Sequence, residues 1–151
     1  MTSLVWRGSA DVEMERPFGD ARVVARSIAA AVRSSDGIPA QQLVFFGGPI
    51  TAPGYDYHTL ASTGAVAQRL ELRFPVPFLS MSLGRFGRSP ATMTLAPFVN
   101  AAASHLDAVY PSAGLGALLF FDLLRVDVSR GLRDGRWSFY LDVNRAFWPV
   151  L

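Results

Sequence analysis

Near its C-terminus the chain reads Trp137-Ser138-Phe139-Tyr140-Leu141-Asp142-Val143-Asn144, with a large apolar residue at every second position. Successive side chains of an extended strand point to opposite faces, so this alternation predicts a strand with one apolar and one polar face. Residues 124–129 alternate in the same way, and Arg133-Asp134-Gly135 supplies turn chemistry between the two stretches. Together the two stretches predict a β-hairpin.

Further toward the N-terminus, alternation indicates strands at residues 6–15, 66–76 and 91–101, and an apolar run that contains glycine indicates another at 114–121. Residues 21–33 are predicted as a fifth strand. The Ala-rich run in 21–33 would also suit a helix, but Val23-Val24 and the neighbouring strands favour a strand. The stretches 36–64 and 78–90 are rich in Gly, Pro, Ser and Thr, and we expect them to be loops. The sequence therefore predicts an all-β fold, an antiparallel meander of about seven strands.

Composition places the chain among folded proteins and excludes several kinds of site. Half of its 151 residues are hydrophobic and 17% are charged, which excludes a disordered segment and suits a single unit spanning 1–151. The chain contains no cysteine, which excludes disulfides, thiolate metal sites and a cysteine nucleophile. With only His58 and His105 as histidines, we expect no metal centre and no cofactor.

Net charge and hydropathy exclude two further classes. All fourteen basic residues are Arg, the twelve acidic residues are scattered, and the net charge is only +2, so no basic stripe for nucleic acid is present. No stretch approaches the ~20 apolar residues of a membrane-spanning helix. The N-terminus lacks the pattern of a signal peptide, so we expect either a cytoplasmic protein or a chain that begins within a longer one.

Strands of roughly ten residues also suit a membrane barrel, in which the apolar face meets lipid and the charged face lines a wet lumen. In a soluble sandwich or small barrel the apolar face is the interior, and alternation alone does not distinguish the two settings. The absence of Lys and the aromatic residues near strand ends favour the membrane, although the aromatic residues also suit an ordinary core and its edges. These aromatic residues are Trp6, Phe18, Phe74, Phe78, Phe120, Phe121, Trp137, Phe147 and Trp148.

Charged residues follow one face of two predicted strands. In a barrel they would form a lumen network of opposite charges, and in a soluble domain they would be solvated surface groups. The residues concerned are Arg69, Glu71, Arg73, Arg125 and Asp127. His58 could act with Ser80 or Ser82 and an acidic residue, but no Gly-x-Ser-x-Gly nucleophile elbow is present and nothing in the sequence brings these residues together. We expect no catalytic residue and no enzyme activity.

Five segments, in order along residues 4–148, resemble the bacterial surface antigen family. Residues 38–55, which include Gly47-Gly48 and Pro53-Gly54-Tyr55, resemble the approach to that family's conserved inward-folding loop. Segments 70–75 and 96–101 resemble its next strands. The last hairpin and the C-terminal aromatic strand of the family correspond to residues 123–132 and 136–148, with Trp137, Phe139, Phe147 and Trp148 as the C-terminal strand signal.

This resemblance implies the C-terminal part of a sixteen-stranded outer-membrane barrel, with 36–64 as the inward-folding loop. The superfamily includes outer-membrane assembly barrels and two-partner secretion transporters. It implies a barrel domain in the outer membrane that inserts or exports proteins, or that anchors a periplasmic domain. The implied partners are outer-membrane lipid, unfolded or translocating polypeptide, the barrel assembly machinery and the remaining strands of the barrel.

Two departures from the family pattern concern the loop and its lumen partner. Pro53 stands where the family has an Arg that reaches toward an acidic residue, and Asn100 stands where the family often has Asp. Because both charges are absent together, neither is left buried without its partner. We expect the loop to fold inward through Pro53 stiffness, Tyr55 packing and hydrogen bonds from Asn100, and the family's substrate-handling activity is in question. At the C-terminus, Pro149-Val150-Leu151 follow the final aromatic residue.

Seven strands do not close such a barrel, and an open sheet edge in lipid is prohibitively costly. We therefore expect this chain to be the C-terminal portion of a longer outer-membrane protein. An eighth strand, for example at 78–85, or association with other chains would be the alternative. The alternative function, from a different class, is a soluble β-barrel or sandwich that binds a small apolar ligand in its interior.

Overall fold

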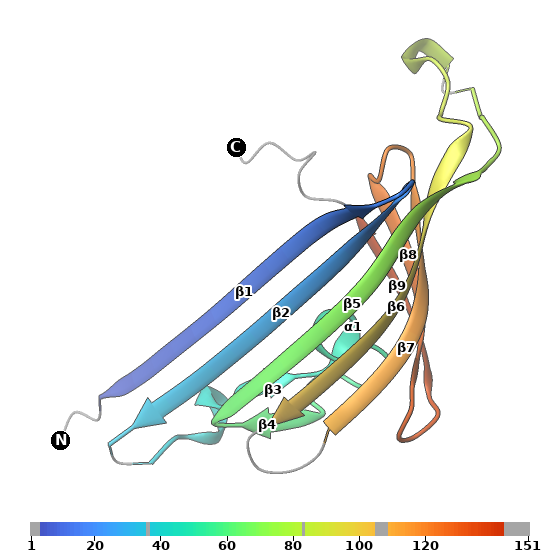
Figure 1. Cartoon of the computed structure of the whole chain (residues 1–151). Coiled ribbons are helices and arrows are strands. Elements are labelled where there is room, and N and C mark those ends of the chain that lie inside the picture. Colours follow the sequence, from blue (N-terminus) through green and yellow to red (C-terminus); the bar gives the residue numbers. More distant parts are fainter. Residues whose placement is uncertain (1–3, 36, 83, 105–108, 144–151) are drawn as a thin grey trace.

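The computed structural model describes residues 4–35, 37–82, 84–104 and 109–143. Seven antiparallel strands follow one another in a single sheet, in the order β1-β2-β5-β6-β7-β8-β9 (Figure 1). These strands are β1 (Val5–Phe18), β2 (Ala21–Ser34), β5 (Gly64–Pro77), β6 (Thr92–Ser104), β7 (Val109–Leu119), β8 (Leu124–Gly131) and β9 (Trp137–Val143). The predicted all-β antiparallel meander of seven strands is confirmed, and residues 21–33 are a strand rather than a helix.

One strand differs clearly from its predicted bounds. β7 begins five residues earlier than expected and includes Pro111, whose carbonyl accepts hydrogen bonds from the Tyr55 hydroxyl and the Leu132 amide. At its other end, Phe120, Phe121 and Asp122 have φ angles of 54°, 62° and 62° and form the turn to β8. The prediction of Phe120 and Phe121 as strand residues is wrong because three successive left-handed residues reverse the chain there.

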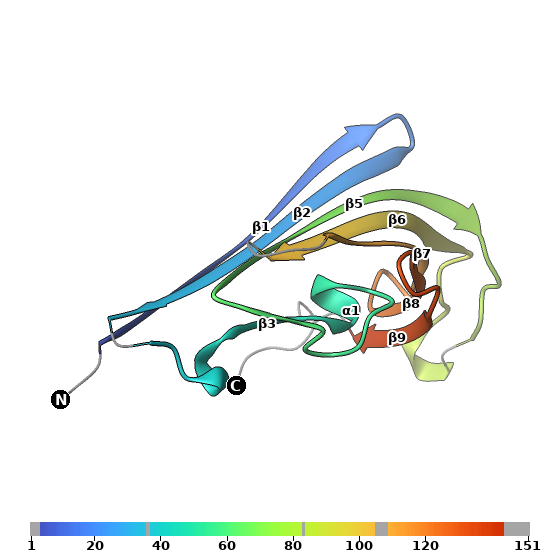
Figure 2. The ribbon, with the colours of Figure 1, turned by 90° about the horizontal axis from the view of Figure 1, so that it is seen from below.

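The segment between β2 and β5 has structure of its own. It contains a 3₁₀ turn at Ala40–Gln42, β3 (Val44–Phe46), α1 (Gly48–Thr51) and β4 (Leu60–Ser62). β3 and β4 pair with each other as a separate antiparallel ribbon. Figure 2 shows the main sheet curling around this segment, with α1 inside the curl. The other long connection, 78–91, contains a 3₁₀ turn at Gly84–Phe86 and projects beyond the opposite end of the sheet (Figure 1).

A small apolar core lies between the β3–β4 ribbon and the inner face of the sheet. Its buried residues are Val32, Val44, Phe46, Ala52, Tyr55, Leu60, Ala65, Ala67 and Ala102. Three of the alanines come from β5 and β6, and their short side chains allow the ribbon to approach the sheet closely. The core thus holds the infolded segment against one end of the concave face.

Away from that core, the stretch of sheet from β5 to β8 exposes its apolar face and buries its charged one. On β5, the outward Val66 and Leu70 are 48% and 51% exposed, whereas the inward Ala67 and Glu71 are 2% and 3% exposed. The cross-strand register continues this division through the sheet, so Trp137 and Phe139 on β9 also face outward and are 68% and 69% exposed. The usual arrangement of a soluble sheet, with apolar residues covered and charges in water, is reversed.

Candidate functional site

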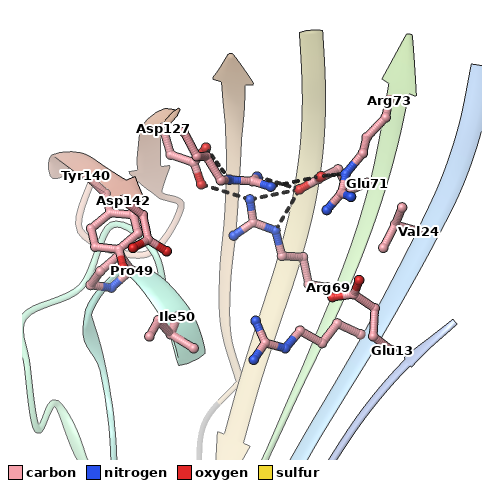
Figure 3. Close-up of a pocket in the computed structure, with 12 residues that line it drawn as sticks. Glu13, Val24, Pro49, Ile50, Arg69, Glu71, Arg73, Asp127, Tyr140 and Asp142 are labelled. Atoms are coloured by element: carbon pink, nitrogen blue, oxygen red, sulfur yellow. Dashed lines mark hydrogen bonds and ion pairs between the residues drawn. The ribbon is translucent and has the colours of Figure 1, made fainter. Parts of the chain in front are cut away.

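Five charged side chains meet on the inner face of the sheet, and they are the residues that the alternation placed on one face of two predicted strands. The Arg69 Nη2 atom lies 3.0 Å from both Glu71 Oε2 and Asp127 Oδ2. The Arg125 guanidinium lies 2.6 Å from Glu71 Oε2 through Nη2 and 2.8 Å from Asp127 Oδ1 through Nε. Arg73 donates from Nε to the Glu71 carboxylate (Figure 3). Three guanidinium groups therefore share two carboxylates.

The network joins β5 to β8 across two intervening strands. Asp127 on β8 pairs with Gly116 on β7, and Gly116 pairs with Ala96 on β6. These two small residues leave the inner surface low enough for the arginine side chains to lie over it. A Cβ on Gly116 would lie only 2.6 Å from Asp127 Oδ1 and 3.0 Å from Arg125 Nη2. The Arg69 Cζ atom also lies 3.6 Å above the centre of the Phe98 ring.

Because these side chains are buried, each charge is stable only in the presence of the opposite charges beside it. The Glu71 and Asp127 side chains are 2% and 6% exposed, and the three arginine side chains are 13–18% exposed. A charge removed from water at this depth is strongly unfavourable unless opposite charges and hydrogen bonds compensate it. Glu71 accepts from all three arginines, so it is the central acceptor of the network.

The infolded segment contacts the sheet through Gly54, Tyr55 and their neighbours. The Gly54 amide donates to Ser138 Oγ at 2.9 Å. The Tyr55 hydroxyl donates to the Pro111 carbonyl at 2.6 Å and accepts from the Arg133 amide at 3.2 Å. Its ring meets the Tyr110 ring edge-on, with centroids 5.2 Å apart. These contacts connect the segment to β7, to β9 and to the β8–β9 turn.

Pro53 and Asn100, the two positions at which we noted departures from the family pattern, are both buried in the structure. Pro53 is fully buried, and Asn100 is 4% exposed. The Asn100 amide donates from Nδ2 to the Thr51 carbonyl at 3.2 Å, while its Oδ1 atom finds no partner among the described residues. A neutral side chain of β6 thus contacts the infolded segment.

Gly47 and Gly48 lie at the start of α1 and set the direction of the infolded segment. Gly48 donates from its amide to the Tyr55 carbonyl at 3.1 Å, which closes the segment on itself. The His58 ring packs against the Phe45 ring, with the two ring centroids 4.8 Å apart. Of the C-terminal strand signal, Trp137 and Phe139 lie on the outward face of β9, and Phe147 and Trp148 fall outside the described residues.

A chamber of about 440 Å³ lies between α1 and the charged wall. Besides the five-residue network, it is lined by Glu13, Val24, Arg26, Pro49, Ile50, Tyr140 and Asp142 (Figure 3). The lining contains both signs of charge. It therefore suits water, ions or a polar chain better than an apolar ligand.

Several residues of this site were not anticipated from the sequence. Gly131 lies against Gly54, and Ser138 accepts the Gly54 amide. Gly116 makes room for the ion network, and glycine within a strand is the one signal that suggests such a close approach. The Gly54 contacts depend on residues about eighty positions away, and no local pattern indicates them.

The described part of the chain lacks two other features. No group of three or more His, Cys, Asp or Glu residues there is arranged to hold a metal ion. No helix among those residues is both long and apolar enough to cross a membrane. No protein-family model and no curated protein matches this chain.

Gly54 provides a test of how the infolded segment is held. Its φ angle is +86°, and a Cβ there would overlap the backbone of Gly131. We expect Gly54→Ala to release the segment and raise the rate of chymotrypsin cleavage after Phe46 and Tyr55, both buried in the structure, by more than about tenfold. Cleavage in this segment is measured by mass spectrometry under native conditions.

Gly87→Ala is the matched control for this substitution. Gly87 has a φ angle of +89°, but no described atom lies within 4 Å of the position that a Cβ would take there. The substitution carries the same left-handed backbone cost without the overlap, so cleavage after Phe46 and Tyr55 should stay unchanged. Equal cleavage in the two variants would show that close approach at Gly131 does not hold the segment.

Proposed function

We propose that this chain forms part of the wall of an outer-membrane β-barrel of the surface-antigen type, acting in membrane-protein assembly or polypeptide export. The observation that carries the proposal is the reversed sheet, with apolar side chains outside and a buried ion network inside. Transmembrane barrels alternate in this way, because their outer face meets lipid and their lumen is wet. The infolded segment then lies in the lumen and narrows it.

The distribution of charge on the outer face supports the same setting. In the seven described strands, only three outward positions carry charge, and each is an arginine near a strand end: Arg16, Arg33 and Arg130. Arginine near a membrane surface extends its guanidinium toward phosphate groups while its carbon chain stays in the apolar layer. All the carboxylates of the described strands face inward.

Two polar residues on the outer face compensate each other. Ser27 on β2 donates from its hydroxyl to Gln68 Oε1 on β5 at 2.8 Å, and the two residues are register partners. Polar groups in lipid require internal hydrogen bonds because no water is available to them. This pair supplies such a bond in the middle of an otherwise apolar face.

The edges of the sheet support a role as one part of a larger wall. β1 and β9 each pair with a described strand on one side only. In lipid, unpaired strand edges are strongly unfavourable, so the remaining strands of a barrel are the partner that this setting requires. The soluble alternative, with an apolar ligand inside, is less well supported because the chamber is lined by charged groups.

Tryptophan fluorescence in lipid vesicles tests the proposal. In a Trp148→Phe background, Trp6 and Trp137 lie on the outward face, and we expect lipids brominated on their acyl chains to quench both. The matched control replaces all three tryptophans with Phe and introduces Tyr140→Trp, which faces the chamber and should be quenched little. Equal quenching of inward and outward tryptophans in the vesicle-bound chain would contradict the proposal.

A further inference from the structure

The free edge of β1 is the longest unpaired strand edge in the described structure. β1 has fourteen residues, pairs with β2 on one side, and meets no described strand on the other. We propose that this edge binds an antiparallel amphipathic strand whose inward residues are basic opposite Glu13 and Glu15 and acidic opposite Arg7. The inference rests on the proposed function, because a membrane setting defines which face of the added strand is apolar.

The directions of the two edge strands determine whether an odd or an even number of further strands can close the sheet into a barrel. Six successive antiparallel pairings separate β1 from β9, so these two edge strands run parallel to each other. They therefore do not close on one another through an antiparallel pair. A complement that pairs antiparallel with both edges must contain an odd number of strands.

The inward side chains of β1 form a row with an uneven charge pattern. In order along the strand they are Arg7, Ser9, Asp11, Glu13 and Glu15. Asp11 receives two hydrogen bonds from Arg26, at 2.9 Å and 2.6 Å, and Glu15 receives one from Arg22 at 3.1 Å. Glu13 faces Arg26 in the register, but the Arg26 guanidinium is bonded to Asp11, and neither Glu13 nor Arg7 lies within ion-pair distance of a charged group among the described residues. Charge of the opposite sign on the added strand is thus favourable opposite Glu13 and, six residues away, opposite Arg7.

This pattern also sets the register of the added strand. Opposite charges on directly facing residues of an antiparallel pair are favourable, and like charges are unfavourable. A slip of two residues would leave at least one basic position of the partner opposite an acidic residue of β1, but it would move the acidic position of the partner away from Arg7, so the Arg7 pair fixes the register. The outward residues Trp6, Val12 and Met14 then require apolar neighbours on the lipid side.

A second copy of the chain meets the charge pattern but not the membrane setting. Two β1 strands paired about Ala10 would place Arg7 of each copy opposite Glu13 of the other. In that pairing one copy is upside down in the membrane relative to the other. The two infolded segments would then lie at opposite ends of the barrel, and the polar connections of one copy would lie on the opposite side of the bilayer from those of the other. We therefore assign the edge to a strand of different sequence, with the pattern described above.

Two synthetic strands test the assignment in detergent micelles. Both alternate Leu with polar residues and have the same composition. From its N-terminus, the matched peptide carries Arg, Arg, Ser, Cys and Glu at its inward positions, and the control carries Glu, Ser, Arg, Cys and Arg. Because the chain has no cysteine, Ser9→Cys allows a disulfide with the peptide cysteine that faces it. We expect at least about fivefold more cross-link with the matched peptide, and a smaller preference with Glu13→Gln.

Three results would overturn the inference: equal yields from the two peptides, no cross-link with either, or an Ala10→Cys chain that cross-links to itself and excludes the peptide. Ala10 would lie on the two-fold axis of the self-paired arrangement, so its cysteine reports a dimer. Brominated-detergent quenching of Trp6 and Trp137 in the same samples keeps the two proposals apart. Quenching without peptide binding removes the edge assignment alone, and absence of quenching removes the proposed function.

Discussion

Glu71→Ala is expected to lower the free energy of unfolding by about 3–5 kcal/mol. The substitution removes the carboxylate that accepts from Arg69, Arg73 and Arg125. It leaves Arg73 without that acceptor, and Arg69 and Arg125 with Asp127 alone. Mutual repulsion and lost hydrogen bonds both act against the folded state. Urea unfolding in lipid vesicles, followed by tryptophan fluorescence, measures the change.

Asp11→Ala is the control for this substitution. Asp11 also binds an arginine with both carboxylate oxygens, but its side chain is 49% exposed and solvent screens the pair. Its removal should cost no more than about 1 kcal/mol. Glu71→Gln keeps the shape of the side chain and should retain most of the loss seen with Glu71→Ala. Similar costs at Glu71 and Asp11 would show that the network does not stabilise the inner wall.

The strands and their faces were predictable because both follow from local periodicity. Alternation located most strands of the main sheet, and it placed Arg69, Glu71 and Arg73 on one face of β5. The strand at 21–33 was predicted from its Val pair and its neighbours, and the strand at 114–121 from an apolar run that contains glycine. If the strands lie side by side in chain order, this face of β5 lies close enough to β8 for its charged residues to reach Arg125 and Asp127. A meander requires no long-range information beyond its hairpins.

The infolded segment was not predictable in the same way. Its short elements β3, α1 and β4 carry too few residues for periodicity to show, and they are held by contacts with residues distant in sequence. The early start of β7 was hidden by Pro111, which local rules place outside a strand interior. Alternation also did not show whether the apolar face or the charged face of the sheet is buried, because a soluble sheet and a membrane barrel have the same two-residue period.

Leu70→Arg is expected to lower the free energy of unfolding in lipid by about 2–4 kcal/mol. Leu70 lies near the middle of β5 on the outward face, where its side chain is 51% exposed. At that depth a guanidinium would lie in the hydrocarbon layer, far from the arginines at the strand ends. The measurement is the shift in urea midpoint of the chain folded in vesicles.

Leu79→Arg is the matched control, because Leu79 lies in the 78–91 connection and is 75% exposed. Both sites expose a leucine, so both substitutions would be nearly neutral, within about 0.5 kcal/mol, if water surrounded the whole molecule. In lipid we expect only the strand position to be costly, because the connection projects beyond the end of the sheet (Figure 1). A large loss at Leu70 with little change at Leu79 therefore reports the solvent of the outer face directly. Equal, small effects at both positions would show that water surrounds the outer face of the sheet, and they would contradict the proposal that this face contacts lipid.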